Sequence, residues 1–250
     1  MANAMLLFLP GLICDARVFA PQLAAFADSR AVNGYGTAAS LPEMARIALA
    51  QAPERFDLFG HSMGARVALE VFRLAPERVR RLALCSTGVH PLGPNEPGKR
   101  RDLQAIGHAR GFEALVDTWL PPMVAEANRA DEELYGPMRQ MCLDQNQQIF
   151  DAQIEALLGR PEQQGLLAQI ECPTLVMTGE LDTWSPPAQH EAMAARIANS
   201  TLVIVPGAGH MLPLEAPEAV NQAIARWLEQ PANDTTSTRQ PALGEAQAND

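Results

Sequence analysis

Six short apolar runs that alternate with helical patterns constrain the fold of this chain most strongly. Several of these runs are apolar almost without interruption, which is typical of strands buried on both faces of a parallel sheet. The alternation predicts an α/β fold with a doubly wound, mainly parallel six-stranded sheet and right-handed crossovers. The expected strands cover residues 5–9, 31–35, 55–60, 81–86, 174–179 and 201–207, and the expected helices cover 16–27, 42–52, 63–75, 187–198 and 216–229.

The alternation breaks once, between the fourth and the fifth expected strand. From residue 90 to about residue 170 no stretch has the pattern of a strand, and the interval opens with HPLGPNEPG, whose prolines and glycines are typical of a linker. We expect residues 90–170 to form a helical cap on a core made of residues 1–89 and 171–230. Extra helices packed on the core would give the same pattern. Residues 231–250 contain one leucine and no aromatic residue, which predicts a disordered tail.

The charge and the cysteine pattern exclude several classes of function. With 19 basic and 29 acidic residues the chain has a formal net charge of −10, which disfavours binding to nucleic acid or to an anionic membrane surface. No run approaches the roughly 18 apolar residues of a membrane span, and no secretion signal is recognisable, so we expect a cytoplasmic protein. The four cysteines form no CxxC pair, so free thiols are expected rather than disulfides or a metal site. No pattern indicates an oligomeric state.

The most informative motif is Gly60-His61-Ser62-Met63-Gly64, which ends the third expected strand and opens the next helix. A G-x-S-x-G motif in this context is typical of a sharp turn that holds a nucleophilic serine in a strained backbone conformation. Side chains at Gly60 and Gly64 would collide across such a turn, and the helix N-terminus favours negative charge developing near Ser62. We therefore predict that Ser62 is a nucleophile.

A serine nucleophile needs a histidine base and a carboxylate that orients it. In a sheet of this kind the expected order along the chain is serine, then carboxylate, then histidine. Asp182 follows the fifth expected strand and His210 follows the sixth, so both belong at the same sheet edge as Ser62. Glu180 and Glu215 are alternative carboxylates. Structural or solvent-exposed roles are expected for the other histidines, which are His61, His90, His108 and His190.

Four segments together resemble the α/β-hydrolase superfamily, and most closely its small bacterial esterases and lactonases with a helical cap. They are LPGLICDARVF, GHSMG, TGELDTWSPP and VPGAGHMLPLEAPE, and the resemblance extends over roughly residues 5–230. It implies an oxyanion hole formed by the backbone N–H groups of Leu12 and Met63. The sequence departs from the family at Pro10-Gly11, where relatives carry His-Gly. In addition, residues 1–4 are too few to build the family's antiparallel edge hairpin.

The resemblance implies a serine hydrolase that cleaves a small carboxylic ester or lactone through an acyl-enzyme. His210 would act as the base and Asp182 would orient it. Neither a metal nor an organic cofactor is needed, and the expected partner is a small-molecule substrate. Other chemistries occur on the same fold, so a C–C hydrolase or a carbon–oxygen lyase is the alternative. A non-catalytic ligand-binding module is disfavoured because all three residues of the expected triad are present.

Substrate-binding residues are expected beside the triad and in the cap. Trp184 and Met211 are candidates because they lie next to the expected carboxylate and base in the sequence. Candidates in the cap are Trp119, Met123 and Met141, although such side chains also commonly pack the core of a cap.

Two further pairs of residues carry expectations of their own. We expect Cys14 to be a partly buried thiol beside the site, open to thiol reagents. Asp15 is expected to cap the helix that follows at Ala16. On the last expected cap helix, Gln153 and Arg160 are expected to be solvated, with binding of a polar substrate group as the alternative.

Overall fold

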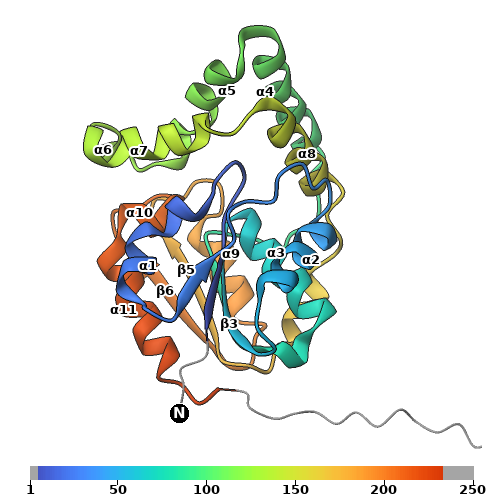
Figure 1. The fold of residues 1–250 in the computed structure, drawn as a ribbon, viewed down its shortest axis with the longest axis vertical. Coiled ribbons are helices and arrows are strands. Elements are labelled where there is room, and N and C mark those ends of the chain that lie inside the picture. Colours follow the sequence, from blue (N-terminus) through green and yellow to red (C-terminus); the bar gives the residue numbers. More distant parts are fainter. Residues whose placement is uncertain (1–4, 233–250) are drawn as a thin grey trace, which may run out of the picture.

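A single parallel sheet forms the centre of the molecule (Figure 1). The computed structural model describes residues 5–232, in which six strands lie in the order β2-β1-β3-β4-β5-β6 and every neighbouring pair runs parallel. All residues of β1, β3 and β5 are buried, which confirms the predicted doubly wound α/β fold. The strands are β1 Leu6–Leu9, β2 Ser29–Ala31, β3 Phe56–His61, β4 Val79–Cys85, β5 Thr174–Gly179 and β6 Ser200–Val205.

The second strand is the one that the sequence misplaces. The run at 31–35 was expected to be a strand, but β2 ends at Ala31 and only Val32 N still bonds to Phe8 O of β1, at 3.0 Å. Val32 and Tyr35 are buried although they lie beyond the strand. Their apolar character therefore reflects the burial of a loop, and not strand pairing.

Helices cover both faces of the sheet. α1 and α11 pack together on one face, and α2 and α3 pack together on the other (Figure 1). Local sequence explains where two of these segments begin, because Asp15 caps η1 through Arg17 N and Ser40 caps α2 through Glu43 N. The core helices are η1 Ala16–Phe19, α1 Ala20–Ala25, α2 Leu41–Gln51, α3 Met63–Leu74, η2 Pro76–Arg78, α9 Pro187–Ala194, α10 Leu212–Glu215 and α11 Pro217–Leu228.

The helices between β4 and β5 lie together over one end of the sheet (Figure 1). Buried polar contacts attach them to the core: Ile13 N donates to Gln153 Oε1 at 2.8 Å, and His210 N donates to Met123 O at 2.8 Å. Glu215 Oε2 also accepts from Ala125 N at 2.8 Å. These helices and turns are α4 Glu96–Arg110, α5 Phe112–Trp119, η3 Pro121–Met123, α6 Glu126–Arg129, α7 Glu132–Leu143, α8 Gln147–Leu158 and η4 Gln164–Gln169.

The strand order places a switch point between β1 and β3. The chain leaves β1 toward β2 on one side, and then returns to build β3 to β6 on the other side. Loops at the carboxyl ends of the strands flanking such a point diverge and leave a crevice, which is where open α/β sheets bind ligands. Leu12 follows β1 and Ser62 follows β3, and both line a pocket that residues of α4, α5 and α8 also line.

Two expectations concern the ends and the surroundings of the chain. Of the tail expected at 231–250, residues 233–250 lie outside the described residues. Over residues 5–232 no helix combines the length and the apolar character needed to cross a membrane.

Candidate active site

Ser62 stands at a strained turn between β3 and α3. Its backbone lies at φ 55° and ψ −120°, a region that residues with side chains rarely adopt and that functional sites retain. Both of its peptide groups are held, because Ser62 N donates to Cys85 O at 2.8 Å and Thr87 Oγ1 donates to Ser62 O at 3.0 Å. A Cβ at Gly60 would lie 2.4 Å from Ala65 Cα, so the helix can follow the strand this closely only past glycine.

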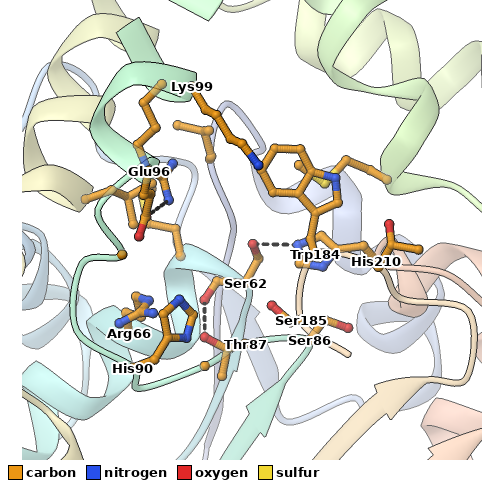
Figure 2. Close-up of a pocket in the computed structure, with 18 of the residues that line it drawn as sticks. Ser62, Arg66, Ser86, Thr87, His90, Glu96, Lys99, Trp184, Ser185 and His210 are labelled. Carbon is orange, nitrogen blue, oxygen red and sulfur yellow. Dashed lines mark hydrogen bonds and ion pairs between the residues drawn. The ribbon is translucent and has the colours of Figure 1, made fainter. Parts of the chain in front are cut away.

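A chain of hydrogen bonds runs from Ser62 through His210 to Asp182. His210 Nε2 lies 2.8 Å from Ser62 Oγ (Figure 2). His210 Nδ1 lies 2.8 Å from Asp182 Oδ2. His210 and Asp182 are buried, although 148 residues separate Ser62 from His210 in the sequence. The structure thus brings together the three residues expected to form a triad.

Asp182 is fixed by more than the imidazole. Its Oδ1 accepts from Trp184 N at 2.9 Å and from Ser185 N at 2.8 Å, so the carboxylate caps the turn that follows β5. Burial alone would raise the pKa of Asp182, but the His210 ring and these hydrogen bonds outweigh it and hold the pKa below its usual value. Asp182 therefore carries its negative charge at neutral pH and keeps one oxygen aimed at His210.

The backbone of His210 is also anchored, by two residues that sequence patterns do not single out for this role. His210 N donates to Met123 O, and His61 Nε2 lies 2.8 Å from His210 O, where it must be the donor. Burial, followed by the nearby His210 ring, lowers the pKa of His61 to about 3, so that His61 stays neutral. His61 therefore has the structural role that was expected of it.

The loop after β1 approaches Ser62 closely. A Cβ at Gly11 would lie 3.2 Å from Ser62 Cβ, which explains glycine at this position by proximity. Ile13 has a φ of 46°, and Gln153 of α8 secures that turn by accepting from Ile13 N. In the described part of the chain the N–H groups of Leu12 and Met63 donate to no protein acceptor, and both residues line the pocket beside Ser62.

A pocket of about 540 Å³ opens between Ser62 and the helices above it. Of the predicted substrate-binding residues, Trp184, Trp119 and Met123 line it. The expectation is wrong for Met211 and Met141, which are buried in the hydrophobic core and do not reach the pocket. Met211 follows His210 directly, and a neighbour of a residue that faces a pocket commonly points the other way.

Charged pocket residues are the ones that sequence reasoning missed. Arg66, His90, Glu96 and Lys99 line the cavity (Figure 2), and Arg100 lines it as well. One of them had a signal in the sequence, because Arg66 lies only four residues after Ser62, in the first turn of the helix that Ser62 precedes. The other four come from the segment inserted after β4, whose packing no local pattern fixes.

Two cap residues expected to be solvated are in fact buried. Gln153 is the partner of Ile13, as described above. Arg160 bonds to Glu96 Oε1 and Oε2 at 2.8 and 2.7 Å, and only 2% of its side chain is exposed. Both hydrogen-bonded contacts join segments far apart in the sequence, which is why the prediction of solvent-exposed side chains was wrong.

The remaining candidates lie away from the reacting groups. Glu215 bonds to the backbone of the loops around it, and Glu180 Oε2 accepts from Gly207 N at 3.2 Å, so neither carboxylate is the partner of His210. His190 is buried and accepts from Thr87 N at 2.9 Å. Cys14 is 3% exposed, not partly buried as expected, and its hydrogen bond with Cys142, together with burial, raises the pKa of its thiol.

Comparison with proteins of known sequence finds enzymes of several activities. The chain is 29% identical to the pimeloyl-[acyl-carrier protein] methyl ester esterase of Pectobacterium carotovorum, over 79% of each chain. It is 27% identical to a 2-hydroxy-6-oxononadienedioate/2-hydroxy-6-oxononatrienedioate hydrolase of Pseudomonas putida, over 70% of this chain and 63% of that enzyme. It is 28% identical to a putative 2-succinyl-6-hydroxy-2,4-cyclohexadiene-1-carboxylate synthase of Bacillus subtilis, over 88% and 84%.

Comparison with solved structures agrees with this picture. A thermophilic esterase from Thermogutta terrifontis, with malate bound, superposes with a TM-score of 0.82 at 30% identity, over 90% of this chain and 89% of that one. An enol-lactonase from Burkholderia xenovorans shares the fold, with a TM-score of 0.80 at 20% identity over 91% and 92%. The family model for the alpha/beta hydrolase family matches residues 5–223, which is most of the described chain. This protein is therefore a member of the alpha/beta hydrolase family.

Proposed function

We propose that this protein is a serine hydrolase that cleaves a small carboxylic ester or lactone through an acyl-enzyme. The observation that carries the proposal is the hydrogen-bonded chain Ser62–His210–Asp182, at 2.8 Å and 2.8 Å, with Ser62 strained at the head of α3. The esterases from Pectobacterium and Thermogutta support an ester substrate by similarity.

In the first half of the reaction Ser62 Oγ attacks the carbonyl carbon. His210 Nε2 takes the hydroxyl proton as the new C–O bond forms, and the electron pair of the carbonyl moves onto its oxygen. Asp182 holds the proton on Nδ1 and stabilises the imidazolium by its charge. The backbone N–H groups of Leu12 and Met63 receive the oxyanion, and each such donor contributes about 2.7–4 kcal/mol in the transition state.

In the second half the intermediate collapses and the leaving group departs. His210 gives its proton to the departing alcohol oxygen, which leaves an ester between Ser62 and the acyl group. Water then attacks this ester, with His210 again as the base, and the acid is released as Ser62 recovers its proton. In a lactone the alcohol stays attached to the acyl group, so a single hydroxy acid leaves.

A panel of p-nitrophenyl esters of increasing acyl length, run beside simple lactones, tests the proposal. The expected result is turnover with a burst of p-nitrophenolate in wild-type protein and none in Ser62→Ala. The matched control is Ser86→Ala, because Ser86 also lines the pocket and also has a positive φ but lies outside the hydrogen-bonded chain. Equal turnover in wild type and Ser62→Ala would overturn the assignment.

C–C bond hydrolysis is the second candidate, and the similarity to the Pseudomonas putida hydrolase favours it. The same nucleophile, base and oxyanion donors would serve attack on a ketone carbonyl. Incubation with the 2-hydroxy-6-oxononadienedioate named for that enzyme distinguishes the two functions. Turnover of the dienedioate at a higher kcat/KM than any ester or lactone of the panel would make C–C hydrolysis the function.

A further inference from the structure

Positive charge gathers on one wall of the pocket. Arg66, Lys99 and Arg100 line that wall, and Arg160 stands behind it against Glu96. These four cations face one carboxylate, that of Glu96. The whole chain has a formal net charge of −10, so this local excess of positive charge runs against the composition of the protein.

Glu96 does not neutralise the whole cluster, because two arginines share it. Arg160 binds both of its oxygens, and Arg100 Nε and Nη2 bind its Oε1 at 2.9 and 2.8 Å. Burial would raise the pKa of Glu96, but these two arginines outweigh it and lower the pKa to about 2. Both oxygens of this carboxylate are thus bound by other arginines, and Glu96 forms no ion pair with Arg66, although its charge partly offsets the lowering of the Arg66 pKa.

Arg66 is buried without an anionic partner. Its exposed fraction is 7%, and within residues 5–232 it forms no ion pair and one long hydrogen bond, 3.4 Å from Nη1 to the neutral Gln163 Oε1. Glu70, one turn further along α3, gives its carboxylate to Arg73 at 3.2 Å and to Gln163 at 2.8 Å. Burial, followed by the charge of Arg160, lowers the pKa of Arg66 to about 9, so that it still carries its proton at neutral pH.

Such an arginine costs the fold stability. Burying a cation without a counterion is unfavourable, and an apolar or neutral side chain at the same position would avoid that cost. The positive charge of Arg66 is not needed to hold Gln163, because Gln163 Nε2 already donates a hydrogen bond to the backbone oxygen of Arg66 at 2.8 Å. The guanidinium has five N–H donors in a fork that matches a carboxylate. Within residues 5–232 only Nη1 has a protein acceptor, and the residue lines the pocket.

The distance along the helix links this charge to the reacting group. Arg66 follows Ser62 by four residues and lies in the first turn of α3, and both residues line the same pocket. Figure 2 shows Arg66 beside His90 and near Ser62, with Glu96 above them on the same side of the view and Lys99 farther up. An anionic group bound at Arg66 therefore lies only a few bonds from a carbonyl placed over Ser62.

We propose that the pocket binds a free carboxylate of the substrate, with Arg66 as its counterion and Lys99 at the cap side. This inference rests on the proposed function and makes it narrower, because the substrate becomes a short ester or lactone that also carries a carboxylate. Burial, followed by the positive charges of Arg66 and Arg160, lowers the pKa of His90, which leaves the anion-binding role to the arginine and the lysine.

Selectivity between charged and neutral esters tests the inference. Monomethyl succinate and monomethyl glutarate are compared with the corresponding dimethyl esters, with methanol release as the readout. Wild-type protein is expected to prefer the monoesters in kcat/KM, and Arg66→Gln is expected to lower that preference roughly ten- to a hundredfold, the range of a charge-assisted hydrogen bond. Arg110→Gln removes the same charge from an exposed position of α4 and is expected to keep the wild-type preference.

Two results would overturn the inference. One is equal kcat/KM of wild-type protein for the monoesters and the dimethyl esters, which needs no variant. The other is a large fall in the unfolding midpoint of Arg66→Gln, because Arg66 would then be a structural tether. The expected midpoint is unchanged or higher, since an unpaired buried charge is removed. Arg66→Lys keeps the charge and is expected to recover part of the preference.

Binding without turnover separates this inference from the proposed function. In Ser62→Ala protein, glutarate is titrated by calorimetry, and methylphosphonate serves as the phosphate-like anion. Glutarate binding that disappears in the double variant with Arg66→Gln supports the carboxylate site even if no ester is cleaved. Tighter binding of methylphosphonate than of glutarate would mean that the site binds a phosphate group and not a carboxylate. If neither anion binds, the proposed site is refuted.

Discussion

Replacement of Asp182 by asparagine reverses the proton arrangement of His210. Oδ1 of Asp182 accepts two backbone N–H groups, from Trp184 and Ser185. In Asp182→Asn the amide oxygen must take that place, because an NH₂ group there would leave two buried N–H donors unpaired, at about 1–3 kcal/mol each. The NH₂ group then faces His210 Nδ1. Nδ1 becomes an acceptor, Nε2 carries the proton, and Nε2 can no longer take the proton of Ser62.

The expected loss follows from this wrong tautomer. The aspartate-to-asparagine change in a Ser-His-Asp triad lowers kcat about 10⁴-fold, which corresponds to about 5.4 kcal/mol of transition-state stabilisation. The fold should survive, since the side chains are of equal size and the two backbone hydrogen bonds persist. KM should change little, because neither Trp184 nor Ser185 loses its place in the pocket lining.

The assay is the hydrolysis of p-nitrophenyl acetate, with thermal unfolding measured in parallel. Glu180→Gln is the matched control: it removes a carboxylate two residues away, whose Oε2 bonds to Gly207 N. It should keep wild-type turnover within about threefold, since surface substitutions have small effects. Turnover of Asp182→Asn within tenfold of wild type would refute the tautomer argument, and a 10³-fold loss in Glu180→Gln would transfer the orienting role to that residue.

Substitutions at three other positions test the parts that support the site. Gln153→Leu leaves the Ile13 N–H group buried and unpaired and releases the loop after β1, so kcat should fall about 10- to 100-fold. Gln153→Glu keeps an acceptor for this N–H group and should keep most of the activity. Steady-state kinetics of the two variants checks this prediction. Gly64→Ala places a Cβ 2.1 Å from Leu9 O, so no folded protein should be recovered in the soluble fraction. Burial lowers the pKa of His190 to about 4, whereas an unfolded histidine titrates near 6.5. The unfolded chain therefore binds a proton that the folded chain excludes, and the free energy of unfolding falls as the pH drops from 6.5 to 4; in urea titrations His190→Gln should show a shallower fall.

Local sequence rules predicted the fold and the arrangement around Ser62 well. Parallel strands buried on both faces leave apolar runs, and a sharp strand-to-helix turn requires the glycines at Gly60 and Gly64, so both features are visible in short segments. The order of Asp182 and His210 along the chain was enough to place them at one sheet edge. Strand β2 was misplaced because a buried loop and a buried strand are equally apolar.

Long-range packing accounts for what the sequence could not predict. Gln153 and Arg160 seemed to be surface residues because their partners lie 140 and 64 residues away. Met211 and Met141 are apolar in the same way as Met123, and only the three-dimensional packing decides which of the three reaches the pocket. The positive wall was missed for a related reason, since it combines a residue of α3 with residues inserted after β4.

The central claim is that Ser62 is a nucleophile activated by His210, and covalent labelling tests it most directly. The protein is treated with a neutral fluorophosphonate, and the adduct is located by peptide mass spectrometry. We expect one adduct per chain, on Ser62, with none in Ser62→Ala and a strongly slowed reaction in His210→Ala. Labelling that persists in Ser62→Ala, or that maps to another residue, would contradict the account.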